Sequence, residues 1–292
     1  MKTYPFFIGI VLLVMAVCSC DSKRDNGDKE AAALLTEAHG LIASGAYEQA
    51  RTLIDSLRSA YPRAFDARKE AIEVMNILEI KEAQHGIAVA DNTLAALSQD
   101  INQLKKDFLL EKDPRYQTVG FYKDKQQPAS SLHRTCLYAE VDETGQLFLV
   151  SVLNGKKLHH ETIIVETGTT DKKESPRCFS FVTDNSNGYE EQASFKKGTD
   201  NGIVDFIAEN SSKAIQITCK GDAGTHRYQL SKTDALSIAR CNELERALQR
   251  EQQLKHSTDS LRIKEKFFTK KQEKDLKNIT PAEEKIIHQK DI

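Results

Sequence analysis

Residues 134–153 read RTCLYAEVDETGQLFLVSVL. On either side of Glu143-Thr144-Gly145, apolar and polar side chains alternate along Arg134–Val141 and Gln146–Leu153. An alternation with a period of two is typical of a β-strand with one buried face, and a glycine between two such runs indicates a tight turn. The stretch therefore predicts an antiparallel β-hairpin.

The same pattern recurs along residues 113–230, which we interpret as one antiparallel β domain. Asn187-Gly188 and the run Gly221–Gly224 each separate two short alternating segments, and a further strand is expected over Ile203–Ala208. Asn-Gly is a strong hairpin signal because both residues accept a positive φ. The turns predict about eight strands in a meander, either closed as a barrel or paired as a sandwich.

Long helical segments flank this domain on both sides. Asp66–Lys112 contains no proline and one glycine, and its apolar residues recur at spacings of three and four: Leu94, Leu97, Ile101, Leu104 and Phe108. Ser231–Lys277 opens with a serine suited to cap a helix and carries a second stripe: Ile238, Cys241, Leu244, Leu248, Leu254 and Leu261. The fold class expected is therefore α+β, with long helices flanking an inserted antiparallel β meander.

The two stripes predict that the long helices pack against each other in antiparallel fashion. Residues near Leu104 should then face residues near Leu244, and residues near Leu94 should face residues near Leu254. The alternative is that each helix lies separately on the β domain. Residues 231–278 are expected to be helical and residues 279–292 to form a disordered tail.

The C-terminal segment is rich in lysine around Phe267-Phe268. Such a segment is either a basic amphipathic surface that touches acidic lipid headgroups or a solvated helix end. Because acidic residues interrupt the lysines, we favour the solvated helix end.

Residues 31–112 are expected to begin with a helical hairpin. An apolar stripe runs to Ile42, Ser44–Tyr47 interrupts it, and a second helix is expected over Glu48–Ala60. The hairpin resembles one tetratricopeptide repeat in the spacing of seven residues: Ala38, Gly45, Tyr47, Ala50, Ile54, Leu57 and Pro62. The resemblance implies two closely packed helices. It covers a single copy, so it does not extend to the peptide binding of longer arrays.

The first residues have the character of an export signal. Lys2 precedes an uncharged, mostly apolar run that is too short to span a membrane, and Val17-Cys18-Ser19-Cys20 follows it. These four residues resemble the lipobox of bacterial lipoprotein signal peptides. The resemblance implies removal of residues 1–19 and acylation of Cys20, which would anchor the chain to a membrane of the cell envelope. An ordinary secretory signal cleaved nearby is the alternative.

The anchor leads to an expectation about location. Residues 20–30 are polar and predict a flexible tether between lipid and fold. The protein would be attached to the inner or the outer membrane, facing the periplasm or the cell surface, and Asp21 does not decide between them.

The composition bears on possible partners, and the cysteines bear on disulfides and metal sites. With 41 basic and 43 acidic side chains, the chain has a net charge of −2, which predicts no nucleic-acid partner. Four cysteines follow the anchor, and in an exported protein they form either two disulfides or buried thiols: Cys136, Cys178, Cys219 and Cys241. Their spacing does not suggest a zinc site.

We find no catalytic motif and expect no enzyme, cofactor or metal. His159-His160-Glu161 resembles the start of a zinc-protease motif, but Ile164 occupies the place of the second histidine, which favours a strand.

The expected function is a non-catalytic scaffold or protein-interaction module that contacts another envelope protein, with its oligomeric state left open. The alternative is a glycan- or small-ligand-binding lipoprotein that uses the β domain. The chain has no tryptophan for sugar stacking, and four strand phenylalanines are expected in the core: Phe148, Phe179, Phe181 and Phe206.

Overall fold

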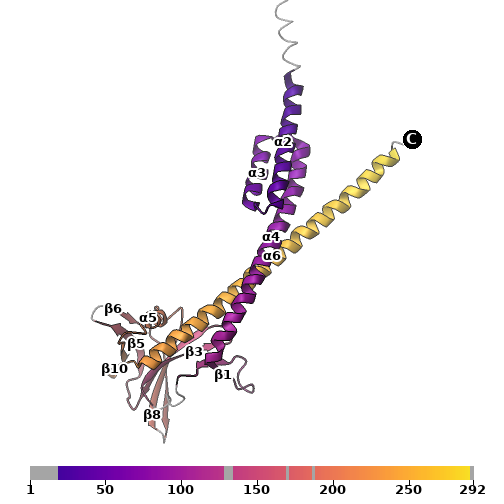
Figure 1. Cartoon of the computed structure of the whole chain (residues 1–292). Coiled ribbons are helices and arrows are strands. Elements are labelled where there is room, and N and C mark those ends of the chain that lie inside the picture. The colour runs from indigo at the N-terminus through magenta and orange to yellow at the C-terminus, as the bar shows by residue number, and fades with distance from the viewer. Residues whose placement is uncertain (1–18, 128–133, 169–170, 186–187, 290–292) are drawn as a thin grey trace, which may run out of the picture. The chain divides into compact units, whose positions relative to one another are not determined.

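The computed structural model describes residues 19–127, 134–168, 171–185 and 188–289, with the side chains of 19–26, 185 and 276–289 left out of the description. The chain divides into two compact units. Unit 1 comprises residues 1–92 and 256–292, and unit 2 comprises residues 93–255. Figure 1 shows the elements of both units, and each unit is described by itself.

Unit 1 is helical. It contains α2 (Ser19–Ala43), α3 (Tyr47–Ala60), the first part of α4 (Phe65–Leu104) and the last part of α6 (Lys232–Gln289). The expected hairpin of two helices is present as α2 and α3, and Gly45 provides the positive φ of 82° at the turn between them. The apolar stripes of α2, α3 and α4 form one core, whose largest fully buried side chains are Leu35, Ile54, Leu57 and Leu78.

Within unit 1, α4 and α6 run antiparallel. Arg262 pairs with Asp91, whereas Lys264, further along α6, pairs with Glu82, nearer the start of α4. Gly86, the glycine of the long helix, lies at this contact, since a Cβ built on it would stand 2.9 Å from Leu261 Cδ1. The direction of packing predicted from the two stripes is therefore confirmed in this unit.

Unit 2 contains two antiparallel sheets. The first has six strands in the order β1-β2-β3-β4-β8-β7: Phe108–Glu111, Phe121–Asp124, Cys136–Asp142, Leu147–Asn154, Gly188–Lys196 and Ser180–Asn185. The second has four strands in the order β10-β9-β5-β6: Gly224–Gln229, Gln216–Gly221, His160–Thr167 and Asp171–Glu174. The α+β class with an inserted antiparallel β region is confirmed. Among the described residues there are ten strands in two open sheets and no closed barrel.

The hairpin predicted from residues 134–153 is β3 and β4, with Val141 opposite Leu147 and Cys136 opposite Val152. Asp142 Oδ1 accepts the N–H groups of Thr144 and Gln146 and so holds the turn. Strands distant in sequence also pair, because β8 adds to β4 and β9 adds to β5. Strand order is therefore not purely sequential.

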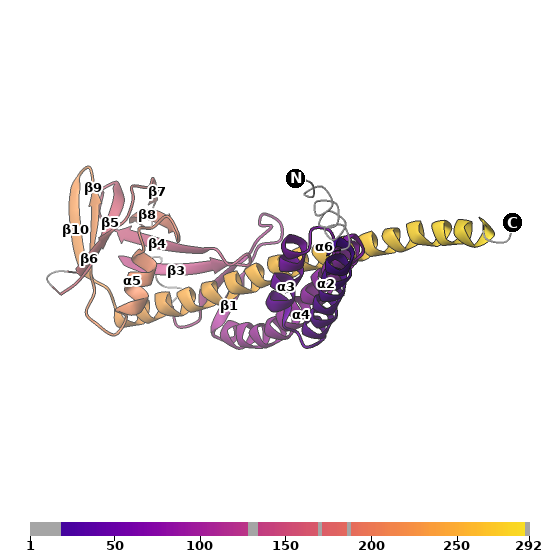
Figure 2. The same ribbon diagram turned by 90° about the horizontal axis from the view of Figure 1, so that it is seen from above.

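The first half of α6 packs on the six-stranded sheet, and Figure 2 shows it running along β3. Ser231 caps the helix as predicted, with its Oγ accepting the N–H of Asp234 at 3.0 Å. Cys241 Sγ donates to the Ala139 carbonyl oxygen at 3.4 Å. Helix and sheets share one buried core, to which α6 contributes Ala235, Ile238, Cys241, Leu244 and Leu248.

The expected strand over Ile203–Ala208 is wrong, because this segment is helix α5 (Ile203–Glu209). The Asp200 carboxylate accepts the N–H groups of Gly202 and Val204 and thereby caps the start of a helix. Ile203, Val204 and Ile207 are fully buried, and the spacing i, i+1, i+4 is that of a helix face and not the alternation of a strand.

Three predicted boundaries also differ. α4 ends at Leu104 and not at Lys112, since a 3₁₀ turn, η1 (Lys105–Asp107), leads into β1. Phe108 therefore joins the core from a strand. At the N-terminus, residues 20–30 belong to α2 instead of forming a flexible tether. At the C-terminus, α6 continues to Gln289, so the expected disordered tail at 279–292 is helical as far as the structure describes it.

Candidate functional site

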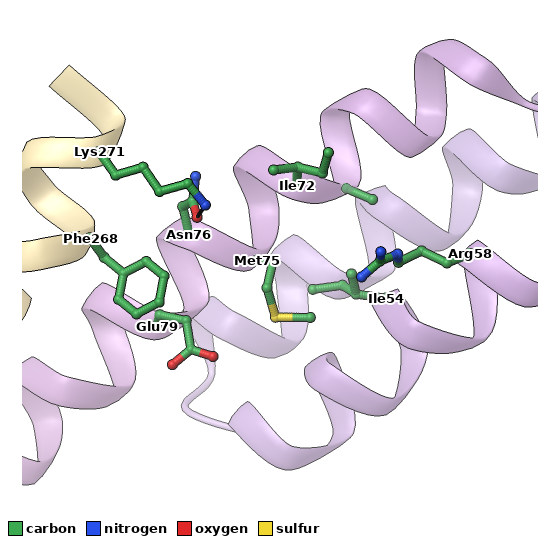
Figure 3. A pocket seen from close by; sticks show the side chains of 9 residues that line it. Ile54, Arg58, Ile72, Met75, Asn76, Glu79, Phe268 and Lys271 are labelled. Carbon is green, nitrogen blue, oxygen red and sulfur yellow. Dashed lines mark hydrogen bonds between the residues drawn. The ribbon is translucent and has the colours of Figure 1, made fainter. Parts of the chain in front are cut away.

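A cavity of about 270 Å³ lies in unit 1 among α3, α4 and α6 (Figure 3). We call it the helical groove and define it by the nine residues that line it: Ile54, Arg58, Ala71, Ile72, Met75, Asn76, Glu79, Phe268 and Lys271. On each of the three helices, the residues that line the groove are spaced three or four positions apart. Each helix therefore presents one face to the groove.

The inner wall of the groove is apolar. Ile54 and Ala71 are buried, Met75 is half-buried, and the Phe268 ring closes one side in Figure 3. Ile72, which also lines the groove, is 50% exposed. The groove thus offers apolar contact surface to a side chain from another molecule.

An ion-pair network bounds one side of the groove. Glu79 accepts hydrogen bonds from Arg51 on α3 and Lys264 on α6, and both cations also reach Glu82. Burial acts to raise the pKa of Glu79, but the hydrogen bonds from the two cations outweigh it and hold that pKa below its usual value. The network ties the three helices together and keeps Glu79 charged.

Of the other two charged side chains of the groove, Lys271 is engaged within it and Arg58 is not. Lys271 donates to Asn76 Oδ1 at 3.0 Å, and its Nζ lies 5.8 Å from the centroid of the Phe268 ring. Arg58 is exposed and forms no hydrogen bond or ion pair within the described part of the chain. An apolar wall beside an unpaired guanidinium favours a ligand that carries both an apolar group and a carboxylate.

A second polar cluster lies inside unit 2, around the fully buried Glu191. Its carboxylate accepts the backbone N–H groups of Leu158, His159 and His160 at 2.8–2.9 Å. It also bonds to His160 Nδ1 and the Tyr189 hydroxyl, each at 2.9 Å. Although burial acts to raise it, these hydrogen bonds lower the pKa of Glu191 to about 2.

This cluster holds the loop before β5 and is closed to solvent. His160 is fully buried, begins β5 as the sequence suggested, and its Nε2 atom has no hydrogen-bond partner among the described residues. His159 takes a positive φ of 51° as its N–H turns toward Glu191. Because Glu191 and His160 are fully buried and the carboxylate binds three successive backbone N–H groups, the arrangement supports the loop.

The four cysteines of the folded region are thiols, and the described part of the chain contains no disulfide among them. Cys136, Cys219 and Cys241 are buried and Cys178 is half-buried. Burial raises the pKa of Cys136, Cys178 and Cys219 to about 11, and it raises the pKa of Cys241 further. The buried-thiol alternative agrees with the structure. The described residues also hold no cluster of three metal-ligating side chains.

Two of the four phenylalanines expected in the core are exposed instead. Phe148 and Phe206 are partly buried, but Phe179 is 96% and Phe181 70% exposed. They lie at and just before β7, which is an edge of the six-stranded sheet. Phe181 and its neighbour Val182 point to opposite faces and both are exposed, so neither face of this strand is covered. The prediction was wrong because alternation does not distinguish a central strand from an edge strand.

Cys20, the predicted lipid-attachment residue, lies in the first turn of α2, and its side chain is outside the described region. Residues 1–18, which belong to the predicted signal peptide 1–19, are likewise outside it. The groove contains no predicted site residue. If the predicted antiparallel pairing of α4 and α6 is continued beyond Leu261, Phe268 and Lys271 fall beside α4. The sequence therefore contained a signal for these two groove residues.

No protein-family model matches the chain, and comparisons with curated proteins and with solved structures found no match. Across the described residues, no helix combines the length and apolar character needed to cross a bilayer. The functional conclusion therefore depends on the sequence signals and on the geometry described above.

Proposed function

We propose that this chain is a lipid-anchored, non-catalytic protein of the cell envelope that binds another envelope protein through the helical groove. The lipobox-like sequence that ends at Cys20 supports the anchor, to either the inner or the outer membrane. The groove supports the interaction because it combines apolar surface with an unpaired cation at its rim.

The single observation that carries the proposal is the juxtaposition of Ile72, Met75 and Arg58. An apolar side chain of the partner would rest on Ile72 and Met75, while a neighbouring carboxylate would pair with Arg58. Glu79 lies at the opposite side and is already neutralised by two cations, so it does not repel an acidic ligand.

A photo-crosslinking amino acid at Ile72, introduced into the full chain in cells, tests this proposal. We expect one discrete adduct, which Arg58→Glu abolishes because the substituted carboxylate repels the partner's carboxylate. Glu70 is a matched control, as it is exposed on the same helix but does not line the groove. Equal adducts at both positions, or an adduct that Arg58→Glu leaves unchanged, would contradict the proposal.

A second candidate function is glycan or small-ligand binding by unit 2. The exposure of Phe179 and Phe181 favours it, because exposed aromatic rings stack on sugar faces. A glycan array probed with the full chain and with Phe179→Ala/Phe181→Ala tests this candidate. Binding that is lost in the double variant would move the function to unit 2, and an array without signal would remove this candidate.

A further inference from the structure

The last part of α6 has two contrasting faces in unit 1. Toward α4 it directs side chains that are at least half-buried: Leu261, Lys264, Glu265, Phe268, Lys271 and Gln272. Away from α4 it directs a continuous row of exposed side chains: Ile263, Lys266, Phe267, Lys270 and Lys274. We call this row the outer face of α6.

Two large apolar side chains stand on the outer face. Ile263 is 71% and Phe267 is 62% exposed, and they are four residues apart, so they lie on consecutive turns of the same helix side. Because the described part of unit 1 does not cover them, both side chains remain in water unless another surface takes them up.

The lysines around them are unpaired. Lys266, Lys270 and Lys274 form no ion pair or hydrogen bond with any described residue. By contrast, the two neighbouring cations Arg262 and Lys264 bind Asp91 and Glu79, respectively. The outer face therefore concentrates three uncompensated positive charges, with Glu273 as the acidic residue among them.

The direction of the helices relates the end of α6 to the proposed anchor. Successive helices of unit 1 reverse direction: α2 and α3 form a hairpin, Arg51 near the start of α3 pairs with Glu82 well along α4, and α4 is antiparallel to α6. After three reversals, the C-terminal end of α6 lies at the same end of unit 1 as the start of α2, where Cys20 is found (Figure 1).

We propose that the outer face of α6 rests on an anionic lipid surface and forms a second membrane contact in addition to the lipid on Cys20. The lysines bind lipid phosphates, and Ile263 and Phe267 enter the boundary between headgroups and acyl chains. This inference rests on the proposed attachment at Cys20, because that attachment holds the chain at a membrane surface. Each lysine near an anionic surface strengthens binding about fivefold, so three strengthen it about 100-fold.

The chain contains no tryptophan, so Phe267→Trp provides a unique fluorescent reporter on the outer face. Phe179→Trp is the matched control, because it makes the same substitution at an exposed site in unit 2. The purified full-length protein is combined with vesicles of phosphatidylcholine, with or without phosphatidylglycerol, that carry brominated acyl chains.

We expect the indole emission of the Phe267→Trp variant to shift to the blue and to be quenched by bromine on the anionic vesicles only. The emission of the Phe179→Trp variant should stay unchanged. Charge reversal by Lys266→Glu, Lys270→Glu and Lys274→Glu should weaken the response at position 267 at least 100-fold in lipid concentration. Because these lysines are exposed and unpaired, the triple variant should keep its circular-dichroism spectrum.

Three results would overturn the inference: equal responses on both kinds of vesicle, a response that survives charge reversal, or a blue shift without vesicles, which would mean that a second protein copy covers the face. Intact-mass analysis of the same sample reports acylation of Cys20 separately. An unmodified Cys20 with a persisting response at position 267 would refute the anchor alone, and an acylated Cys20 without that response would refute the inference alone.

Discussion

Gly86 of α4 lies directly against Leu261 of α6, since a Cβ at position 86 would stand 2.9 Å from Leu261 Cδ1. The long helix tolerates a glycine here because the absence of a side chain lets the two helices of unit 1 approach closely.

Replacing Gly86 by leucine should force these helices apart. We expect Gly86→Leu to lower the free energy of unfolding by about 1–3 kcal/mol, as overpacking typically does. Gly40→Leu is the control, because no atom lies within 4 Å of the place that a Cβ on Gly40 in α2 would occupy, and leucine improves helix propensity there. Urea unfolding followed by circular dichroism measures both variants. Equal stabilisation by the two substitutions would disprove the close contact.

The register of α4 against α6 can be tested by engineered cysteines. Gln84 Nε2 donates to Glu265 Oε1 at 2.9 Å, so a short bis-methanethiosulfonate reagent should bridge Gln84→Cys and Glu265→Cys within one molecule. Gln84→Cys/Gln272→Cys moves the second thiol about 10 Å along the helix and should crosslink far more slowly. Non-reducing electrophoresis after proteolysis distinguishes the two pairs, and faster bridging to position 272 would refute the register.

The pH dependence of unit 2 should follow Glu191. The pKa of this carboxyl is about 2 in the fold, below its value in the unfolded chain, so the stability it contributes is present above pH ~4.5 and is lost as pH falls toward 2. The loss should be on the order of 3 kcal/mol. Glu191→Gln should lower the free energy of unfolding at pH 7. Between pH 4.5 and pH 2, this free energy should fall less steeply than in the unmodified protein. Parallel pH profiles for both proteins would contradict this assignment.

The cysteines should behave as unreactive thiols. At pH 8, a maleimide should modify Cys178 slowly and the three buried cysteines only after unfolding, because burial raises the pKa of all four. Mass analysis of a non-reduced digest should find no disulfide, and Cys178→Ser should abolish the slow native reaction. Rapid modification of Cys241 in the native protein would show that the core is open.

The anchor can be tested at Cys20. Since the sulfur of this residue is the predicted site of acylation, Cys20→Ala should yield a chain that is not acylated and leaves the membrane fraction. Cys18→Ala is the control and should remain anchored. Intact-mass analysis of the native protein would refute the prediction if it showed an unmodified chain that begins elsewhere, and fractionation of the two membranes would identify which one holds the protein.

The sequence alone determined those features whose causes are local. The turn at Glu143–Gly145 and the serine cap at Ser231 follow from the backbone preferences of a few adjacent residues, and both are confirmed. The antiparallel packing of α4 and α6 was also predictable, because a stripe at spacings of three and four shows which face of a helix is buried.

Tertiary structure decided what depends on distant partners. The run Ile203–Ala208 became a helix because the Asp200 carboxylate caps it and the core accepts its buried face. Phe179 and Phe181 are exposed because β7 lies at a sheet edge, and that position follows from the pairing of β8 with β4 across more than 30 residues. The groove arises where three helices meet. Short-range patterns carry no information about which distant elements bury one another, because that choice depends on the apolar surface removed from water by the whole fold.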